Sequence, residues 1–203
     1  MKKFKKGSIG IAGAGGIGGF LVQYLVDFGV NRGQYVLDPS SIELFDNDVV
    51  DPGNLLHQNY TEGDLGSMKA GLIAERYGFG TVTPIYEFME EKDFQKYEII
   101  LSCVDGMAFR KKLYNYGWKN PKKAWIDGRC SSRNYMVLNS KIPRNVLEAE
   151  ITDEDIRGGC LTVKDKTDKV SHVTPLIVAS TMLQTFLGYT RETMSPTKVW
   201  HYI

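Results

Sequence analysis

Residues 8–19 have the sequence Ser-Ile-Gly-Ile-Ala-Gly-Ala-Gly-Gly-Ile-Gly-Gly, and this stretch decides the fold. Its first half is a short apolar run that predicts a buried strand, and apolar residues at helical spacing follow over 20–28. The glycines, in the pattern G-x-G-x-x-G, therefore lie where a strand turns into a helix. Glycine there permits a tight turn, close approach of backbone N–H groups to a phosphate, and close packing of the helix on the sheet.

Two interpretations of this glycine loop stay open. The first is nucleotide binding by Gly13, Gly15, Gly16 and Gly18, because the N-terminus of the following helix offers unpaired N–H groups and a dipole that favours an anion. The second is a structural turn without a ligand. The strand–turn–helix context favours nucleotide binding.

Length and composition are those of an ordinary globular protein. The 203 residues predict one domain with a sizeable core, and a net charge of +1 gives no reason to expect nucleic acid or a membrane as the partner. The chain has no apolar run long enough to span a bilayer and no apolar signal region at its start, so we expect a cytoplasmic protein. The basic start, residues 2–6, predicts a solvated tail, with a contact to phosphate as the alternative.

Strand and helix patterns alternate along the chain, which predicts an α/β fold with a doubly wound, mostly parallel sheet. Further strands are predicted at 42–46, 82–85, 98–104, 124–127, 135–139 and 197–202, and helices at 68–77, 106–117 and 175–187. Gly188 is suited to stop the last helix. We expect a single domain over 1–203, with the polar and irregular residues 143–172 as a candidate mobile crossover loop.

Two carboxylates follow predicted strands. Asp46 ends the strand at 42–46 and Asp105 follows the strand at 98–104, so both should face the glycine loop at the carboxyl edge of the sheet. Asp46 is the candidate for the ribose hydroxyls, although it lies further along than the usual offset of about 20 residues. The alternative is a strand-end aspartate that makes a local turn.

The connection over 47–67 is long and polar, which in compact domains indicates a functional or a disordered segment. Leu55, Leu56 and Tyr60 favour an ordered one. Lys69 follows in the first turn of a predicted helix, where a cation is unfavourable for the helix dipole, so an anionic partner is expected.

With these residues in view, the chain resembles the ThiF/MoeB/ubiquitin-activating-enzyme (E1-like) adenylation family over roughly residues 8–190. The family pattern is G-x-G-G-[IL]-G, then D-x-D-x-V, N-L-x-R-Q, a lysine, and C-x-D with an arginine behind it. These motifs correspond here to Gly13–Gly18, Asp46–Val50, Asn54–Gln58, Lys69, and Cys103–Asp105 with Arg110. The combination at these spacings is far more specific than the glycine motif alone.

The resemblance implies a Rossmann-like adenylation domain that uses ATP and Mg²⁺ to adenylate a C-terminal carboxylate, releasing pyrophosphate. The acceptor in this family is usually a ubiquitin-like or sulfur-carrier protein that ends in glycine. By resemblance Lys69 holds phosphates as a compact charge, Asp105 holds Mg²⁺, and Asn54 and Gln58 place phosphate oxygens. The residues so implied are Lys69, Asp105, His57 and Gln58 for catalysis and Gly13, Gly15, Gly16, Gly18, Asp46, Asp48, Asn54 and Arg110 for nucleotide binding.

For two of these motifs a plainer role stays open. Arg110 binds phosphate or is an exposed arginine on its helix. Cys103, inside an apolar strand, is expected to be a core residue rather than a reactive thiol.

Three features depart from the family pattern. His57 stands where the family has an arginine, and a histidine with an unperturbed pKa of ~6.5 is mostly neutral at pH 7. Three alternatives stay open for His57. It becomes protonated when ATP binds, or the contact that the family's arginine makes is weakened or made by another residue here. In the third, His57 is a neutral surface histidine in a degenerate site. The C-x-x-C pairs of the family are absent, so no structural zinc is expected. Cys160, between flanking glycines and the helix at 175, is a candidate for a covalent intermediate.

The family also commonly dimerises, and we expect a homodimer although this chain begins with lysines and has no early arginine. Two other functions remain as alternatives. A non-catalytic nucleotide-binding or scaffold subunit would account for His57 and the missing zinc pairs. An NAD-dependent oxidoreductase would also use the glycine loop and Asp46, but His172 is the lone candidate for hydride chemistry.

Overall fold

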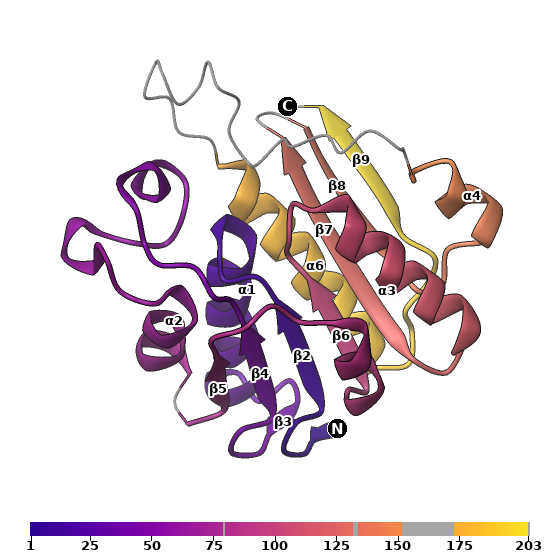
Figure 1. The fold of residues 1–203 in the computed structure, drawn as a ribbon. Coiled ribbons are helices and arrows are strands. Elements are labelled where there is room, and N and C mark those ends of the chain that lie inside the picture. The colour runs from indigo at the N-terminus through magenta and orange to yellow at the C-terminus, as the bar shows by residue number, and fades with distance from the viewer. Residues whose placement is uncertain (79, 132–133, 152–172, 203) are drawn as a thin grey trace.

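The computed structural model describes residues 1–78, 80–131, 134–151 and 173–202 (Figure 1). Within them, seven strands form one sheet in the order β5-β4-β2-β6-β7-β8-β9. The strands are β2 (Ile9–Ala12), β4 (Ile42–Phe45), β5 (Val82–Ile85), β6 (Ile99–Ser102), β7 (Ala124–Ser131), β8 (Asn134–Asn139) and β9 (Lys198–Tyr202). All neighbours from β5 to β7 are parallel, and β8 and β9 add two antiparallel pairings. The predicted mostly parallel α/β sheet is therefore confirmed.

Helices cover both faces of this sheet (Figure 1). The α-helices are α1 (Gly16–Val26), α2 (Lys69–Tyr77), α3 (Met107–Lys119), α4 (Arg144–Glu148) and α6 (Thr174–Thr190). Short helical turns are η1 (Asp27–Asn31), η2 (Pro52–Leu56), η3 (Glu62–Asp64) and η4 (Glu91–Lys96).

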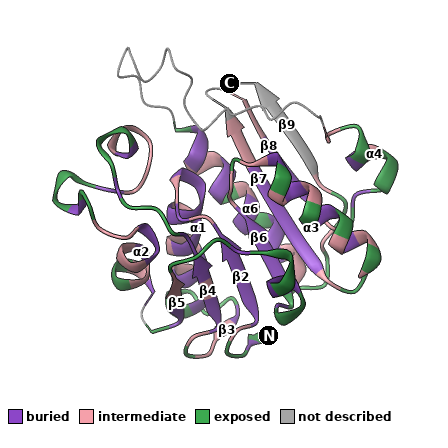
Figure 2. Cartoon of the chain, in the orientation of Figure 1, coloured by how far each residue is buried: buried purple, intermediate pink, exposed green. Residues whose placement is uncertain are grey.

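Side chains alternate between two cores along the buried strands. Ile9 and Ile11 of β2 join α1, α2 and α6 in one apolar cluster, whereas Ala12 and Ile100 join α3, η4 and α4 in the other. The two-residue period of a strand causes this division. In Figure 2, β2, β4 and β6 are largely buried, and the exposed residues lie on the outer sides of the helices and in the connections between elements.

The chain reverses its direction of winding at β2. From this strand, β4 and β5 lie to one side and β6 and β7 to the other. Open α/β sheets bind ligands at such a switch point, outside the carboxyl ends of the strands. The glycine loop follows β2 and therefore lies at this point.

The N-terminus differs from the predicted solvated tail. Residues Lys3–Phe4 form β1, which pairs in parallel with β3 (Val36–Leu37). Phe4 is completely buried and its ring stacks on Phe186 of α6 at 5.3 Å. A single large aromatic ring thus anchors the basic start to the core, because its burial outweighs the solvation of the neighbouring lysines.

Two further expectations are wrong. Gly188 does not stop the last helix, since α6 continues to Thr190 and the backbone reverses at Glu192, which has a φ of 59°. The stretch from 143 contains α4, which was expected to be irregular. The remainder of the candidate crossover loop, 152–172, lies outside the described residues.

Candidate functional site

The glycine loop approaches its neighbours as closely as its sequence predicts. Gly13 has a φ of +93°, a conformation that favours glycine. A Cβ on Gly18 would lie 1.8 Å from the carbonyl oxygen of Gly13, so the first turn of α1 rests directly on the end of β2. A Cβ on Gly16 would lie 3.4 Å from the Pro175 ring of α6. Backbone, rather than side chains, therefore forms the surface of this loop.

The N-terminus of α1 has no side-chain cap and no acidic residue in its first turn. Its N-cap residue, Gly15, has extended backbone and carries no side chain to accept from the following amides. The amides and the dipole at this end favour an anion. This is the arrangement expected for a phosphate-binding turn.

Gln58 lies over this turn. Its Oε1 atom is buried without a hydrogen-bond partner, and it lies 3.8 Å from the position of a Cβ on Gly15. Its Nε2 atom lies 3.3 Å from Nε2 of His57, and the His57 carbonyl oxygen is 3.2 Å from the position of a Cβ on Gly16. The structure thus brings the two predicted residues, 57 and 58, against the glycine loop.

Asp46 ties the end of β4 to the same loop. One carboxylate oxygen accepts from the Ala14 amide at 2.7 Å and the other from the Asp48 amide at 2.8 Å. Burial raises the pKa of Asp46 above its ordinary value, although these two amide bonds favour the charged form. The carboxylate proposed for the ribose thus lies beside the glycine loop, and each of its oxygens already accepts one bond.

Lys69, the first residue of α2, is buried and pairs with the carboxylate of Asp48. Its ammonium lies 3.0 Å from the Asp48 carboxylate, and the two side chains are 7% and 59% exposed. The hydroxyl of Tyr60 donates to the Ala14 carbonyl at 2.6 Å and lies 3.5 Å from the Lys69 carbonyl. Tyr60, which sequence reasoning used only as a sign of order, therefore links the start of α2 to the glycine loop.

Asn54 shapes the connection that carries residues 57 and 58. It is buried in η2, and its side-chain oxygen accepts from the Asp51 amide at 3.0 Å. The Asp51 carboxylate in turn accepts from the amides of Gly53 and Asn54, which completes a capping box. Asn54 thus lies near the candidate site and also stabilises η2, the turn that precedes residues 57 and 58.

Asp105 is exposed in the turn between β6 and α3. The register of the sheet pairs Ala12 with Ser102, so this turn begins beside the glycine loop. A Cβ on Gly13 would lie 3.0 Å from the carbonyl oxygen of Cys103. The carboxyl ends of β2, β4 and β6 therefore meet, as the sequence predicts.

Arg110 is not the exposed helix arginine that one interpretation expected. It is buried and donates to the carbonyls of Val104 and Asp105 and to the Asp127 carboxylate. Asp127 was missed by sequence reasoning. It is completely buried between β7 and α3, where it also accepts from Ser102 at 2.6 Å. A carboxylate within a predicted apolar strand was the signal that could have identified it.

Of the two cysteines in question, Cys103 is partly buried and packs against the core, and burial raises the pKa of its thiol. Cys160 and His172 lie outside the described residues.

Comparison with known proteins places this arrangement in a family. The ThiF family model matches residues 1–198. The chain belongs to the ThiF family. The resemblance inferred from the motifs is therefore confirmed, and with it the Rossmann-like adenylation fold.

Relatives of this ThiF-family chain are distant and longer. It is 26% identical over 179 residues to the ATP-dependent ubiquitin transferase-like protein Cap2 of Escherichia coli (strain TW11681), covering 76% of this chain and 30% of Cap2. The crystal structure of E. coli MccB with ATP matches with a TM-score of 0.63 at 15% identity, over 98% of this chain and 61% of that one. PaaA matches with a TM-score of 0.62 at 13% identity, over 98% and 65%. The chain thus spans less than a third of Cap2 and less than two thirds of MccB.

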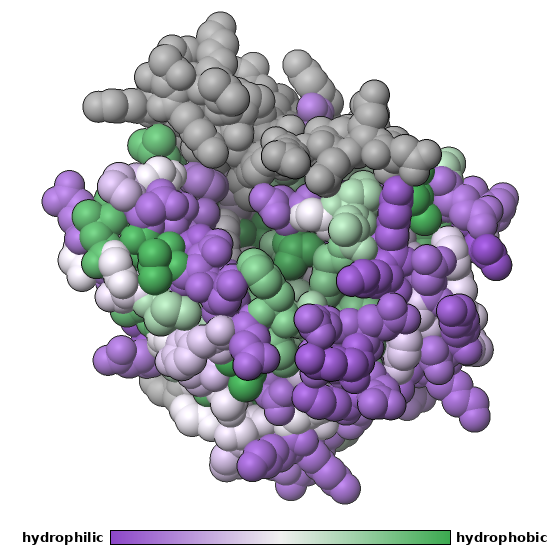
Figure 3. All heavy atoms as spheres, viewed as in Figure 1, coloured by the Kyte–Doolittle hydropathy of each residue, from purple (hydrophilic) through white to green (hydrophobic). Residues whose placement is uncertain are grey.

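The candidate site of this ThiF-family chain has an apolar surface beside it. Figure 3 shows apolar side chains across the middle of this face, with polar surface on both sides. Tyr86 and Phe88, which follow β5, are 52% and 68% exposed. A Cβ on Gly71 of α2 would lie 3.0 Å from the Tyr86 hydroxyl, which places this ring over the helix that Lys69 begins.

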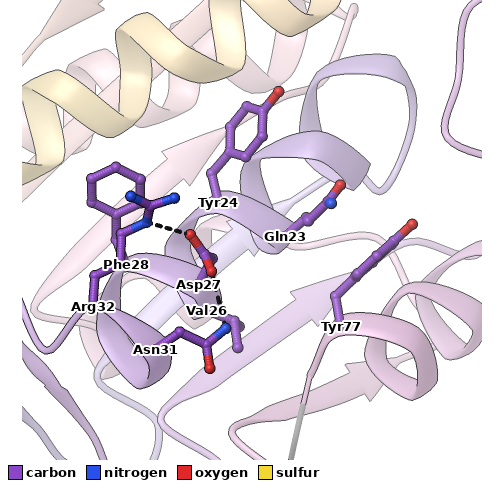
Figure 4. Close-up of a pocket in the computed structure, with 8 residues that line it drawn as sticks. All are labelled: Gln23, Tyr24, Val26, Asp27, Phe28, Asn31, Arg32 and Tyr77. Carbon is purple, nitrogen blue, oxygen red and sulfur yellow. Dashed lines mark hydrogen bonds and ion pairs between the residues drawn. The ribbon is translucent and has the colours of Figure 1, made fainter.

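A separate surface cavity of about 350 Å³ lies at the other end of α1 (Figure 4). It is lined by Gln23, Tyr24, Val26, Asp27, Phe28, Asn31, Arg32 and Tyr77. The Arg32 guanidinium and the Asn31 amide both bond to the Asp27 carboxylate (Figure 4). None of the predicted site residues lines it, and its charges pair with each other.

The donor set for a metal is small. Among the described residues no group of three or more His, Cys, Asp or Glu could hold an ion. Mg²⁺ usually keeps several waters and binds through one or two carboxylates plus substrate phosphates. A single exposed carboxylate, such as that of Asp105, is therefore compatible with this mode. In the part of the chain that the structure describes, no helix is both long and apolar enough to cross a membrane.

Proposed function

We propose that this chain is an ATP-dependent adenylyltransferase that activates the C-terminal carboxylate of a ubiquitin-like or sulfur-carrier protein, or of a peptide, and releases pyrophosphate. The observation that carries the proposal is the meeting of the ends of β2, β4 and β6 with an uncapped helix N-terminus and a buried lysine. In this proposal the backbone amides, one ammonium and one exposed carboxylate act together on a triphosphate and a metal.

The phosphates lie against the glycine loop in this proposal. The backbone of Gly13, Gly15, Gly16 and Gly18 and the N-terminus of α1 favour them. Gln58 contributes through its buried amide, because a 180° rotation exchanges Oε1 for the NH₂ group and turns two donors toward the loop. Asn54 supports the segment that holds this amide.

Lys69 supplies the positive charge. A carboxylate that attacks the α-phosphorus forms a new C–O–P link while the bond to the β-phosphate oxygen breaks, and both reactants are anions. Catalysis is then mainly charge neutralisation and positioning. Lys69 is available for this after it exchanges its partner, the solvated Asp48 carboxylate, for a phosphate.

Asp105 is the proposed ligand of Mg²⁺, and Asp46 the proposed ligand of the ribose. When bound, Mg²⁺ neutralises charge on the phosphate oxygens. His57, beside Gln58, is proposed to contribute a charge in place of the family's arginine. Arg110 holds the turn that carries Asp105, which makes direct binding to phosphate by this buried side chain unnecessary.

The acceptor class is supported by the relatives. MccB has been crystallised with AMPCPP and MccA, and Cap2 is described as ubiquitin transferase-like. A carrier protein or peptide with a free C-terminus is the shared chemistry. The exposed Tyr86 and Phe88 beside α2 offer such a chain an apolar surface. A scaffold subunit and an NAD-dependent oxidoreductase are less favoured, because Lys69 and Asp105 suit a triphosphate with a metal.

Thermal unfolding with ATP and Mg²⁺, and separately with NAD, tests the nucleotide. A ligand at 100 times its Kd stabilises the fold by ~2.7 kcal/mol, which corresponds to roughly 5–10 °C here. We expect this shift with ATP and Mg²⁺, and a smaller one with EDTA or in Asp105→Ala. A shift with NAD alone would overturn the proposal.

The reaction itself is tested by exchange of labelled pyrophosphate into ATP after addition of a synthetic peptide that ends in Gly-Gly. We expect exchange that is lost in Asp105→Ala while its unfolding is unchanged, since this side chain is exposed. Exchange retained in that variant would refute the role of Asp105. A homodimer is also proposed, and a monomer by light scattering at micromolar concentration would contradict it.

A further inference from the structure

The Arg110 guanidinium joins three acceptors around one turn. It donates to the Val104 carbonyl, to the Asp105 carbonyl at 3.1 Å, and to the Asp127 carboxylate at 3.3 Å. Its side chain is 8% exposed. These three hydrogen bonds are directed inward, beneath the turn between β6 and α3.

The two carbonyls belong to the two peptide groups on either side of the Asp105 Cα atom. Each peptide group is planar, so only φ and ψ of Asp105 relate the two planes. Holding both planes therefore fixes φ and ψ, and with them the direction of the Cα–Cβ bond. The Asp105 side chain itself is exposed. The backbone therefore sets the direction in which this side chain leaves the turn.

Asp127 in turn holds Arg110 in place. Its carboxylate accepts from Tyr114 of α3 at 2.5 Å, from Arg129 of β7 at 2.8 Å and from Ser102 of β6 at 2.6 Å. Burial disfavours the charged form, but the guanidinium groups of Arg110 and Arg129 keep the pKa of Asp127 below its ordinary value. A buried charge of this kind persists only when all its bonds are satisfied.

We propose that Arg110 and Asp127 are positioning residues that aim the Asp105 carboxylate at the metal–phosphate group of the nucleotide. This inference rests on the proposed function, because it assigns Asp105 to Mg²⁺ bound with ATP. Neither residue touches nucleotide. Their effect passes through the two peptide groups, just as residues that hydrogen-bond to metal ligands orient those ligands in other proteins.

The first test is Arg110→Lys, which keeps the buried charge but replaces the planar fork by a single point donor. Kd for ATP is measured by calorimetry with Mg²⁺ and with EDTA, and the ratio of the two values gives the gain due to the metal. We expect this gain to fall about 10- to 100-fold, with Kd in EDTA unchanged. A merely structural role would weaken both Kd values alike and leave the ratio constant.

Arg76→Lys is the matched control. Arg76 of α2 pairs with the buried Asp64, so the same change is made at another buried carboxylate away from the turn. We expect the gain from Mg²⁺ to be unaltered there. Loss of the gain in both variants, or retention in Arg110→Lys, overturns the proposal.

Tyr114→Phe covers the case in which Arg110→Lys does not fold. It removes the hydrogen bond that the Tyr114 hydroxyl donates to the Asp127 carboxylate and the one that it accepts from Arg129, and we expect a partial loss of the gain. Hydrogen exchange of the ligand-free protein gives an independent readout: amides 103–106 should exchange faster in both variants than in Arg76→Lys. Wild-type Kd values that are equal with Mg²⁺ and EDTA would refute the metal role of Asp105, whereas unchanged exchange would refute the positioning itself.

Discussion

The Lys69 ammonium is bonded at 3.0 Å to the Asp48 carboxylate, and the lysine is buried while the aspartate is solvated. The pair is therefore asymmetric. Loss of the aspartate leaves a buried charge without its partner, but loss of the lysine leaves a carboxylate that water already solvates. Buried charges lose far more than exposed ones when a partner is removed.

We therefore expect Asp48→Ala to lower the free energy of unfolding by ~1–3 kcal/mol, and Lys69→Met to change it by less than ~1 kcal/mol. Nucleotide binding should respond in the opposite order, since Lys69→Met removes the charge that meets phosphate. Urea unfolding and ATP calorimetry measure the two effects. Equal destabilisation by both substitutions would show that Lys69 finds other partners.

Gly18→Ala should disrupt the glycine loop. The added Cβ would lie 1.8 Å from the Gly13 carbonyl oxygen, which is backbone and cannot rotate away as a side chain could. We expect a loss of about 3 kcal/mol or more in the free energy of unfolding. Gly106→Ala is the control, because no atom lies within 4 Å of its added Cβ; the loss of a favourable N-cap residue of α3 should cost ~1 kcal/mol or less. Similar values for the two variants would contradict the close approach.

His57→Arg should strengthen the binding of ATP. A guanidinium stays charged at every accessible pH, whereas an imidazole is largely neutral above pH 7. We expect about tenfold tighter binding at pH 8, corresponding to one charge-assisted hydrogen bond of ~1.5 kcal/mol or more, and little dependence on pH. Calorimetry at pH 6 and pH 8 measures this. Weaker binding by the variant at both values would indicate that the site has adapted to histidine.

Asp127 should make stability depend on acid. Its pKa is lower in the folded state than the ~3.9 of an unfolded aspartate, so its contribution is fully present above that value and is lost as pH falls through the folded pKa. Asp127→Asn should cost ~3–5 kcal/mol at pH 7, and the difference from wild type should shrink below about pH 4. Chemical unfolding between pH 7 and pH 3 tests this. Asp38→Asn, at a surface pair with Lys3, should cost less than ~1 kcal/mol throughout.

Much of the fold follows from local pattern. The strand at 9–12, the strands at 42–45 and 99–102, and the helix that Lys69 begins all lie where their periodicity predicts. The meeting of their carboxyl ends follows from parallel order alone. The β1–β3 pairing could not be predicted, because it depends on Phe4 reaching Phe186 at the far end of the chain.

For the candidate site, the sequence predicts which residues take part but not which partners they bond to. Motif spacing identified Lys69, Asp46 and Asp105, but not that Asp46 holds the Ala14 amide or that Asp48 already binds Lys69. Asp127 escaped notice because a charge in an apolar strand becomes meaningful only when Arg110, Arg129 and Ser102 are seen around it. Hydrogen bonds from residues distant in the sequence satisfy this buried carboxylate, and local sequence patterns do not reveal them.

Pro175, at the start of α6, lies against Gly16 of the glycine loop. The glycine loop precedes this proline in the sequence, so during synthesis the loop is made before α6. Domains form from the N-terminus as synthesis proceeds, but the wall of this loop is not complete until α6 docks. The glycine loop is thus made before it reaches its final surroundings, and a chain interrupted before α6 would carry the glycine motif without the helix that packs against it.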